Sequence, residues 1–562
     1  MKMKRELRSN FAIGSPRWAT RRTMWRALGI TDEEMKRPKI AIVNSSSNLA
    51  ICFSHLDDIA KKMKEAIYAA GGLAFEVRTS APSDFITVVG GHGGYIQGGR
   101  DLITNDIEAQ VEGAYLDGMI CLASCDKTVP GQIMAAARLN IPTLVFACGY
   151  QPAGKYRGKH MDIEDVFAQA GHYAAGRITL EELTEMTEVA IQGPGVCPGL
   201  GTANSTHMMT EALGLALPGS TPLLANSRKM WDAVRTAGER IVQMVWDDMK
   251  PRDILSPESF ANAVMLMLSA GCSINTVKHL QAIATEAELD VDVFGLFDKY
   301  GPKIPLLTAV RPNGEHTIEE LEAAGGAQAL MKQLESLMFR DAKTLTGQTL
   351  GEVLQNVKVA DEEIIRPLDR ALAYRPAIVM VKGSLAPGYG IIKLAVANDR
   401  PMKFTGPAII YQSGEEAMEG LKKGEIKAGM VAVVRGLGPK TTPGMGQASN
   451  FIFALDGAGL TGKVAVVTDG LLSGLVNKTL LVGEISPEAM DGTPLALVEN
   501  GDLITIDVEQ RIVDLEVSED VLAERRKHAQ DFRRKERGWL SIYQSCVSPL
   551  NKGAVLVDVD KK

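Results

Sequence analysis

Residues 119–150 read MICLASCDKTVPGQIMAAARLNIPTLVFACGY, and this stretch decides the fold. Two apolar runs, 119–125 and 141–150, are typical of buried strands, and residues 129–140 between them have the composition of a helix. Both strands are continuously apolar rather than alternating, as in a parallel sheet whose two faces are covered by helices. The stretch therefore predicts an α/β domain.

The chain before this stretch extends the same pattern. Residues 37–48 and 73–80 are expected to be strands, and residues 55–72 and 99–118 are expected to be helices. Ligands of such folds bind beyond the carboxyl ends of the strands. The loops that follow the predicted strands are therefore the places to look for chemistry.

The rest of the chain changes character twice. Residues 160–350 are mostly helical in pattern, with helices expected at 179–192, 259–271, 274–287 and 317–338. Beyond about residue 375, short β-rich runs alternate with glycine-containing turns every ~8–12 residues, as in a barrel or sandwich. We expect an α/β domain over 1–360 and a β-rich domain over 375–562, the latter with a charged helix or tail at 523–545.

Composition excludes several functions. The chain has 562 residues and a formal charge of −7, without the basic footprint of a nucleic-acid-binding protein. It has no apolar run of the ~18–20 residues that a membrane span needs, and its basic N-terminus lacks the apolar segment of a secretory signal. Seven widely spaced cysteines indicate reduced thiols and a cytoplasmic protein.

Three cysteines lie in loops where a ligand site is expected. Cys52 and Cys125 follow predicted strands, and Cys197 lies in a loop, 193–201, in which six of nine residues are Gly or Pro. Their spacing alone is equally that of unrelated loop cysteines, since none forms a CxxC pair. Three thiolates around an iron–sulfur cluster would leave one iron open to a substrate.

Hard ligands and a candidate base occur in similar places. Asp84 and Asp126 follow predicted strands, and taken alone they are most simply solvated loop residues. The alternative is a Mg²⁺ site, since Mg²⁺ prefers carboxylate ligands. Lys127, beside Asp126, is most simply an ion-pair partner. Ser473 lies between a predicted strand and a glycine, where it is either a turn residue or a general base.

Together these segments resemble the dihydroxy-acid dehydratase/6-phosphogluconate dehydratase family, which includes the sugar-acid dehydratases. The resemblance covers nearly the whole chain. Its strongest marks are CDKTVPG (125–131), GTANSTHMMTEALGLALPGS (201–220), GPKTTPGM (438–445), TDGLLSG (468–474) and GEISPEAMDGTPLALVENGD (483–502).

The resemblance implies a β-barrel-like C-terminal domain, a homodimer or homotetramer, an iron–sulfur cluster and Mg²⁺. By motif, Cys52, Cys125 and Cys197 would hold the cluster, and Cys52 favours [2Fe–2S] over [4Fe–4S]. Asp84, Asp126 and a carbamylated Lys127 would hold the Mg²⁺ ion, and Ser473 would be the base. The reaction implied is dehydration of a 2,3-dihydroxy acid, a small molecule, to a 2-keto acid.

Four departures from the family pattern fall near the expected pocket. Gln447 stands where a metal-binding Glu is usual, Phe53 and Ser384 stand where Asn is usual, and 83–99 differs from the branched-chain biosynthetic enzymes. We interpret these changes as adaptation to a sugar acid. The alternatives are a dihydroxy-acid dehydratase of branched-chain amino-acid biosynthesis and a non-catalytic relative that binds a sugar acid.

Overall fold

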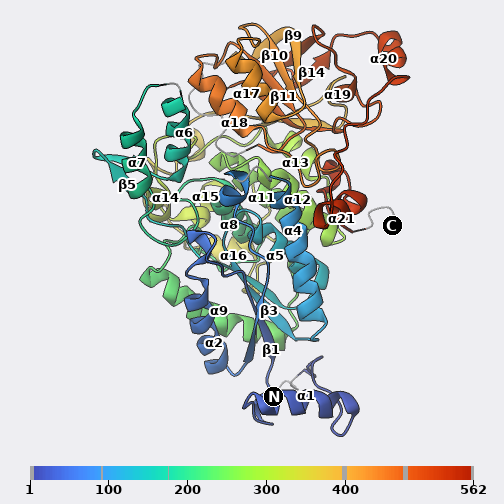
Figure 1. The fold of residues 1–562 in the computed structure, drawn as a ribbon. Coiled ribbons are helices and arrows are strands. Elements are labelled where there is room, and N and C mark those ends of the chain that lie inside the picture. Colours follow the sequence, from blue (N-terminus) through green and yellow to red (C-terminus); the bar gives the residue numbers. More distant parts are fainter. Residues whose placement is uncertain (1–4, 90–92, 175, 395–400, 473–478, 558–562) are drawn as a thin grey trace.

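A computed structural model describes residues 5–89, 93–174, 176–394, 401–472 and 479–557 (Figure 1). The N-terminal region is built on a four-stranded, wholly parallel sheet in the order β2-β1-β3-β4. The strands are β1 (Lys39–Asn44), β2 (Leu73–Arg78), β3 (Gly118–Ala123) and β4 (Thr143–Ala147). The parallel α/β fold predicted from residues 119–150 is therefore confirmed.

Helices cover both faces of this sheet, which explains why its central strands are continuously apolar. Ile40 and Ile42 of β1 belong to the core beneath α2 (Leu56–Ala69) and α9 (Arg228–Asp247), whereas Ala41 and Val43 belong to the core beneath α4 (Gly94–Ile107). The other main covering helix is α5 (Thr128–Leu139), which packs against α4. Burial on both faces removes the alternation that a half-exposed strand would show.

Apart from α9, the helices of residues 163–354 form a helical layer between the two sheets (Figure 1). Three predicted helices occur as α7 (Leu180–Val189), α11 (Pro257–Ala270) and α12 (Asn275–Glu286). The helix expected over 317–338 is instead two helices, because Gly325 adopts a φ of +113° that ends the first. The remaining helices here are α6 (Ile163–Ala174), α8 (Thr202–Ala212), α10 (Pro251–Ile254), α13 (Val293–Tyr300), α14 (Ile318–Ala323), α15 (Gly326–Leu334) and α16 (Leu350–Leu354).

The C-terminal region contains an eight-stranded mixed sheet in the order β14-β13-β9-β10-β11-β12-β8-β7. Lys382, directly after β7, pairs with Ile512 of β14, so the first and last strands are joined and the sheet is barrel-like. The strands are β7 (Ile378–Val381), β8 (Tyr389–Lys393), β9 (Lys403–Tyr411), β10 (Val431–Val434), β11 (Ala465–Thr468), β12 (Leu481–Ser486), β13 (Leu503–Asp507) and β14 (Ile512–Leu515). Helices α17 (Gly414–Lys422) and α18 (Ser449–Gly457) pack together at its side.

The chain ends return to the N-terminal region. In Figure 1 the C-terminal barrel lies above the α/β sheet, while α21 (Trp539–Cys546) descends to pack against α4. The charged segment expected at 523–545 holds the end of α20 (Glu519–Arg526) and most of α21. Helix α1 (Pro16–Ala27) lies at the opposite pole. Among the described residues no helix is long and apolar enough to cross a membrane.

Candidate active site

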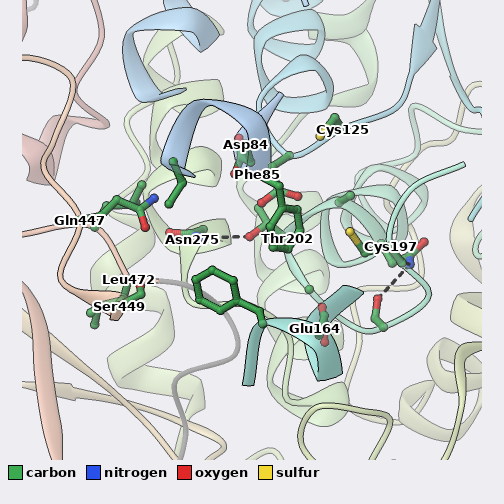
Figure 2. A pocket seen from close by; sticks show the side chains of 18 residues that line it. Asp84, Phe85, Cys125, Glu164, Cys197, Thr202, Asn275, Gln447, Ser449 and Leu472 are labelled. Atoms are coloured by element: carbon green, nitrogen blue, oxygen red, sulfur yellow. Dashed lines mark hydrogen bonds between the residues drawn. The ribbon is translucent and has the colours of Figure 1, made fainter. Parts of the chain in front are cut away.

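A cavity of about 90 Å³ lies where the carboxyl ends of the parallel strands face the C-terminal barrel. Figure 2 shows Asp84 and Cys125 on one side of it, with Gln447, Ser449 and Leu472 entering from the other. The lining residues include five of the residues proposed from the sequence: Asp84, Cys125, Asp126, Cys197 and Gln447. The sheet-edge position expected for an α/β site is therefore where these side chains meet.

The three candidate cluster cysteines come together from three loops. Cys52 lies in a short 3₁₀ helix (Ile51–Phe53) after β1, and Cys125 follows β3 closely. The Ser124 hydroxyl donates a hydrogen bond to the Cys52 carbonyl (2.5 Å), which ties these two loops together. The Cys197 loop is shaped by Asn204, whose amide donates to the carbonyls of Cys197 and Gly199 (2.9 Å each).

The three thiols lie close enough to change one another's pKa values. A hydrogen bond with Cys125, burial and the charge of nearby Cys197 raise the pKa of Cys52. Burial, Glu164 and Cys125 raise the pKa of Cys197. Three thiolates at this spacing repel one another unless a cation lies between them, so the trio fits an iron–sulfur cluster.

The other four cysteines have different surroundings. Cys121, Cys148 and Cys272 are fully buried, and the first two lie on or directly beside strands of the apolar core. Cys546 is exposed in α21. The cysteines that the fold gathers beside the cavity are thus the three that lie in loops at 52, 125 and 197.

Asp84, Asp126 and Lys127 meet at the same edge. Asp84 was expected in a loop, but it is the first residue of a short helix, α3 (Asp84–Val89). Its Oδ2 lies 3.8 Å from Nζ of the fully buried Lys127. Burial and the neighbouring Asp126 carboxylate raise the pKa of Asp84, while Lys127 opposes that shift.

Two atoms of this group lack hydrogen bonds. Among the described residues, Asp84 Oδ1 and Lys127 Nζ are buried without a hydrogen-bond partner. Two half-buried carboxylates side by side, one with an orphaned oxygen, suit a divalent cation that takes oxygen ligands. The donor set therefore fits Mg²⁺, and it fits better if Lys127 carries a carboxylate group.

Gln447 reaches the cavity from the C-terminal region. It lies in the loop between β10 and α18, and its backbone pairs with Leu471. A buried carboxylate shapes this loop: Glu488 accepts hydrogen bonds from the N–H groups of Lys440 (2.9 Å) and Thr441 (2.8 Å). The amide that replaces the usual glutamate thus still lies on the wall that Asp84 and Asp126 line.

Ser473, the candidate base, lies outside the described residues. The two residues before it, Leu471 and Leu472, both line the cavity. The role of this serine therefore stays a prediction.

Several lining residues had no signal in the sequence. Glu164 comes from α6, and burial and the nearby Asp162 raise its pKa well above the ordinary value. Glycine at 199 leaves room for this carboxyl, because a Cβ there would lie 3.0 Å from Glu164 Oε2. Asn275 opens α12 and donates to the hydroxyl of Thr202, which opens α8 (3.0 Å).

One wall of the cavity is apolar. Phe85 and Phe167 meet edge to face with ring centroids 6.2 Å apart, and Phe167 meets Phe453 in the same way at 5.2 Å. The apolar lining residues are Phe85, Val88, Phe167, Ala203, Leu471 and Leu472. The cavity thus combines charged groups with aromatic and aliphatic side chains.

Comparison with known proteins defines the class to which this site belongs. The chain belongs to the dihydroxy-acid/6-phosphogluconate dehydratase family, whose N-terminal part matches residues 37–353 and whose C-terminal part matches residues 363–554. The resemblance drawn from the motifs is confirmed, and the protein is a dehydratase, a hydro-lyase.

Individual relatives are similar over almost their whole length. A dihydroxy-acid dehydratase of Methanothrix thermoacetophila is 40% identical over 557 residues, which cover 98% of this chain and 100% of the relative. Those of Caldicellulosiruptor saccharolyticus and Methanococcus aeolicus are 39% and 38% identical, each covering 96% of this chain and 98% of the relative. These relatives are named as dihydroxy-acid dehydratases, which is the alternative function given above, and not as sugar-acid dehydratases.

Proposed function

We propose that the protein removes water from a 2,3-dihydroxy carboxylate with a short branched apolar substituent, giving the 2-keto acid. The observation that carries this proposal is the composition of the cavity lining, which combines thiols and carboxylates with aromatic and aliphatic side chains. A small branched alkyl group suits the apolar wall, where burying each CH₂ contributes about 0.8 kcal/mol. The names of the relatives point the same way.

Each group of polar residues has a part in this proposal. Cys52, Cys125 and Cys197 would hold an iron–sulfur cluster, and Asp84, Asp126, Lys127 and Gln447 would hold Mg²⁺. When bound, the cluster supplies a Lewis acid for the C3 hydroxyl, and Mg²⁺ supplies a chelating centre for the carboxylate and C2 hydroxyl. In our proposal Lys127 is carbamylated, which turns a buried cation into an oxygen ligand.

Proton movement falls to the residues of the chain. Ser473, as its alkoxide, would accept the C2 proton and return it to the departing C3 hydroxide, which leaves as water. The enol that remains would tautomerise to the 2-keto acid. Leu471 and Leu472 support this role, because they bring the chain to the cavity wall directly before Ser473. The apolar residues of the pocket would exclude competing water from the enol.

A sugar acid is the second candidate. Glu164, Asn275 and Thr202 give the cavity hydroxyl-binding groups that a branched alkyl substituent would not need. Gln447 in place of glutamate also lowers the negative charge of the metal site, so the substrate bound there would differ from that of relatives with glutamate. The six apolar residues of the lining make the branched acid the better fit.

A substrate panel separates the two candidates. Anaerobically reconstituted protein is assayed for keto-acid release from 2,3-dihydroxy-3-methylbutanoate and from five- and six-carbon aldonates. We expect the branched acid to give the highest kcat/KM. Preference for an aldonate would overturn the substrate assignment, and release of no keto acid from any compound would overturn the function.

A further inference from the structure

A fully buried ion pair joins the helical layer to the C-terminal barrel behind the cavity. Lys278 of α12 and Glu484 of β12 are both 0% exposed, with Nζ and Oε1 2.5 Å apart. Glu484 lies at an irregularity of the β12–β8 pairing and has a φ of +51°, which is uncommon for a residue other than glycine. Buried pairs of this kind add little stability over well-packed apolar residues, so stability alone does not account for this pair.

The ammonium group of Lys278 has a second partner that lines the cavity. It donates a hydrogen bond to Oδ1 of Asn275, one turn earlier in α12. Burial lowers the pKa of Lys278 to about 8, and Glu484 opposes this, so the ammonium form persists at neutral pH. The carbonyl end of the Asn275 amide therefore faces a permanent donor.

This contact fixes which way the amide points. An ammonium group can only donate, so Asn275 must present its oxygen to Lys278 and its nitrogen to the opposite side. There Nδ2 donates to the hydroxyl of Thr202 (3.0 Å), which is also 3.0 Å from the hydroxyl of Ser273. Nδ2 carries two N–H groups, and the contacts of the described residues account for one of them.

We propose that Asn275 binds an oxygen of the substrate through this second N–H group, and that Lys278 and Glu484 are its positioning residues. The inference rests on the proposed function for the identity of the substrate. Asn275 is only 3% exposed and lines the cavity together with Thr202, so a donor there meets ligand rather than bulk water. The N–H group suits an oxygen of the substrate carboxylate, since a hydrogen bond to a charged acceptor is stronger than one to a neutral acceptor.

The placement at the start of two helices strengthens the choice of a carboxylate. Gly201, Thr202 and Ala203 line the cavity at the N-terminus of α8, where no side chain of the described residues caps the helix. The free N–H groups and the positive end of the helix dipole favour an anion beside the Asn275 amide. Asn275 and Thr202 would thus add a second contact for the substrate carboxylate, beside the Mg²⁺ ion that Asp84 and Asp126 would hold.

The test compares substitutions along this chain of contacts. Asn275→Ala and the double variant Lys278→Met/Glu484→Gln are expected to raise KM for 2,3-dihydroxy-3-methylbutanoate by about tenfold or more, with a smaller change in kcat. The double variant avoids leaving one charge buried alone, and thermal unfolding verifies that it folds. Combining all three substitutions should raise KM no further than Asn275→Ala alone, since the pair acts through Asn275.

The matched control is Glu286→Gln. Glu286 also lies in α12, is nearly fully buried and pairs with Arg138 (2.7 Å), but it does not line the cavity. This variant should lose stability without any change in KM. The inference would be overturned if Asn275→Ala left KM unchanged, or if the control changed KM as much as Asn275→Ala does. In either case, turnover by the wild-type protein would leave the proposed function intact. A wild-type protein without turnover would overturn the proposed function itself.

Discussion

The two halves of the site are held together by a contact between glycines. Gly444 lies three residues before Gln447, with a φ of +78°, and a Cβ there would lie 1.8 Å from the carbonyl oxygen of Gly94 at the start of α4. A Cβ at Gly94 would in turn lie 2.2 Å from the carbonyl oxygen of Pro443. Backbone therefore packs on backbone, and this close approach sets how far Gln447 lies from Asp84.

Gly444→Ala tests this contact. The left-handed backbone costs an alanine about 1–2 kcal/mol, and overlap with a backbone oxygen adds about 1–3 kcal/mol. Because the overlap can be relieved only by moving the loop, Gln447 should withdraw from the carboxylates. We expect a lower midpoint of thermal unfolding and a several-fold higher Mg²⁺ concentration for half-maximal activity.

Gly424→Ala is the matched control. Gly424 has a φ of +71°, but a Cβ there would have no atom of the described residues within 4 Å. The free energy of unfolding of this variant should fall only by the backbone cost of about 1–2 kcal/mol, and its Mg²⁺ dependence should equal that of the wild type. Equal unfolding midpoints for the two variants, with equal Mg²⁺ dependence, would refute the reasoning that the Gly94–Gly444 contact positions Gln447.

Three further predictions concern buried groups. Cys52→Ser should lower the iron content of purified protein, whereas Cys148→Ser, in the apolar core, should leave it unchanged. Lys278→Met alone should destabilise the fold by about 3–5 kcal/mol, and adding Glu484→Gln should recover part of that loss in thermal unfolding. Burial raises the pKa of Glu488 to about 7, so the stability that its protonated form contributes is present below its ordinary pKa of 4.5 and is lost as pH rises to 7. In Glu488→Gln the free energy of unfolding should fall less over this pH range, by on the order of 3 kcal/mol.

The sequence was most informative where local pattern and topology coincide. The apolar runs of β1, β3 and β4 and the polar loops after them located Cys52, Cys125 and Asp126 at one sheet edge, because parallel strands end together. The position of Cys197 followed from a glycine- and proline-rich loop that precedes a helix. The pattern of residues placed these four side chains in loops beside recognisable elements, and the family motifs then assigned them as ligands.

The parts of the fold and of the site that the sequence did not predict depend on contacts between distant segments. Lys278 and Glu484 are 206 residues apart, and nothing in either local sequence shows that they pair. Glu164 and Asn275 lie on ordinary amphipathic helices, so their exposure to the cavity is decided by packing alone. The closure of the C-terminal sheet through Lys382 and Ile512 is likewise a contact between distant strands, and turn spacing allowed either a barrel or a sandwich.

The apolar lining of the cavity suits a branched dihydroxy acid better than the sugar acid that the sequence indicated. Departures such as Gln447 and Phe53 indicated a modified pocket, and we interpreted them as adaptation to a sugar acid. The phenylalanine and leucine wall of the cavity is visible only in three dimensions, because it joins α3, α6 and the loop after β11. That wall, with the names of the relatives, favours the branched dihydroxy acid.

The most direct test of the account measures cluster and turnover in one preparation. Protein purified without oxygen is analysed for iron and acid-labile sulfide, and the same sample is assayed for keto-acid release from 2,3-dihydroxy-3-methylbutanoate with Mg²⁺. We predict a brown protein with iron and sulfide in equal amounts, whose turnover is proportional to its iron content. Colourless protein that binds no iron after reconstitution, or turnover that is independent of iron, would contradict the assignment of Cys52, Cys125 and Cys197.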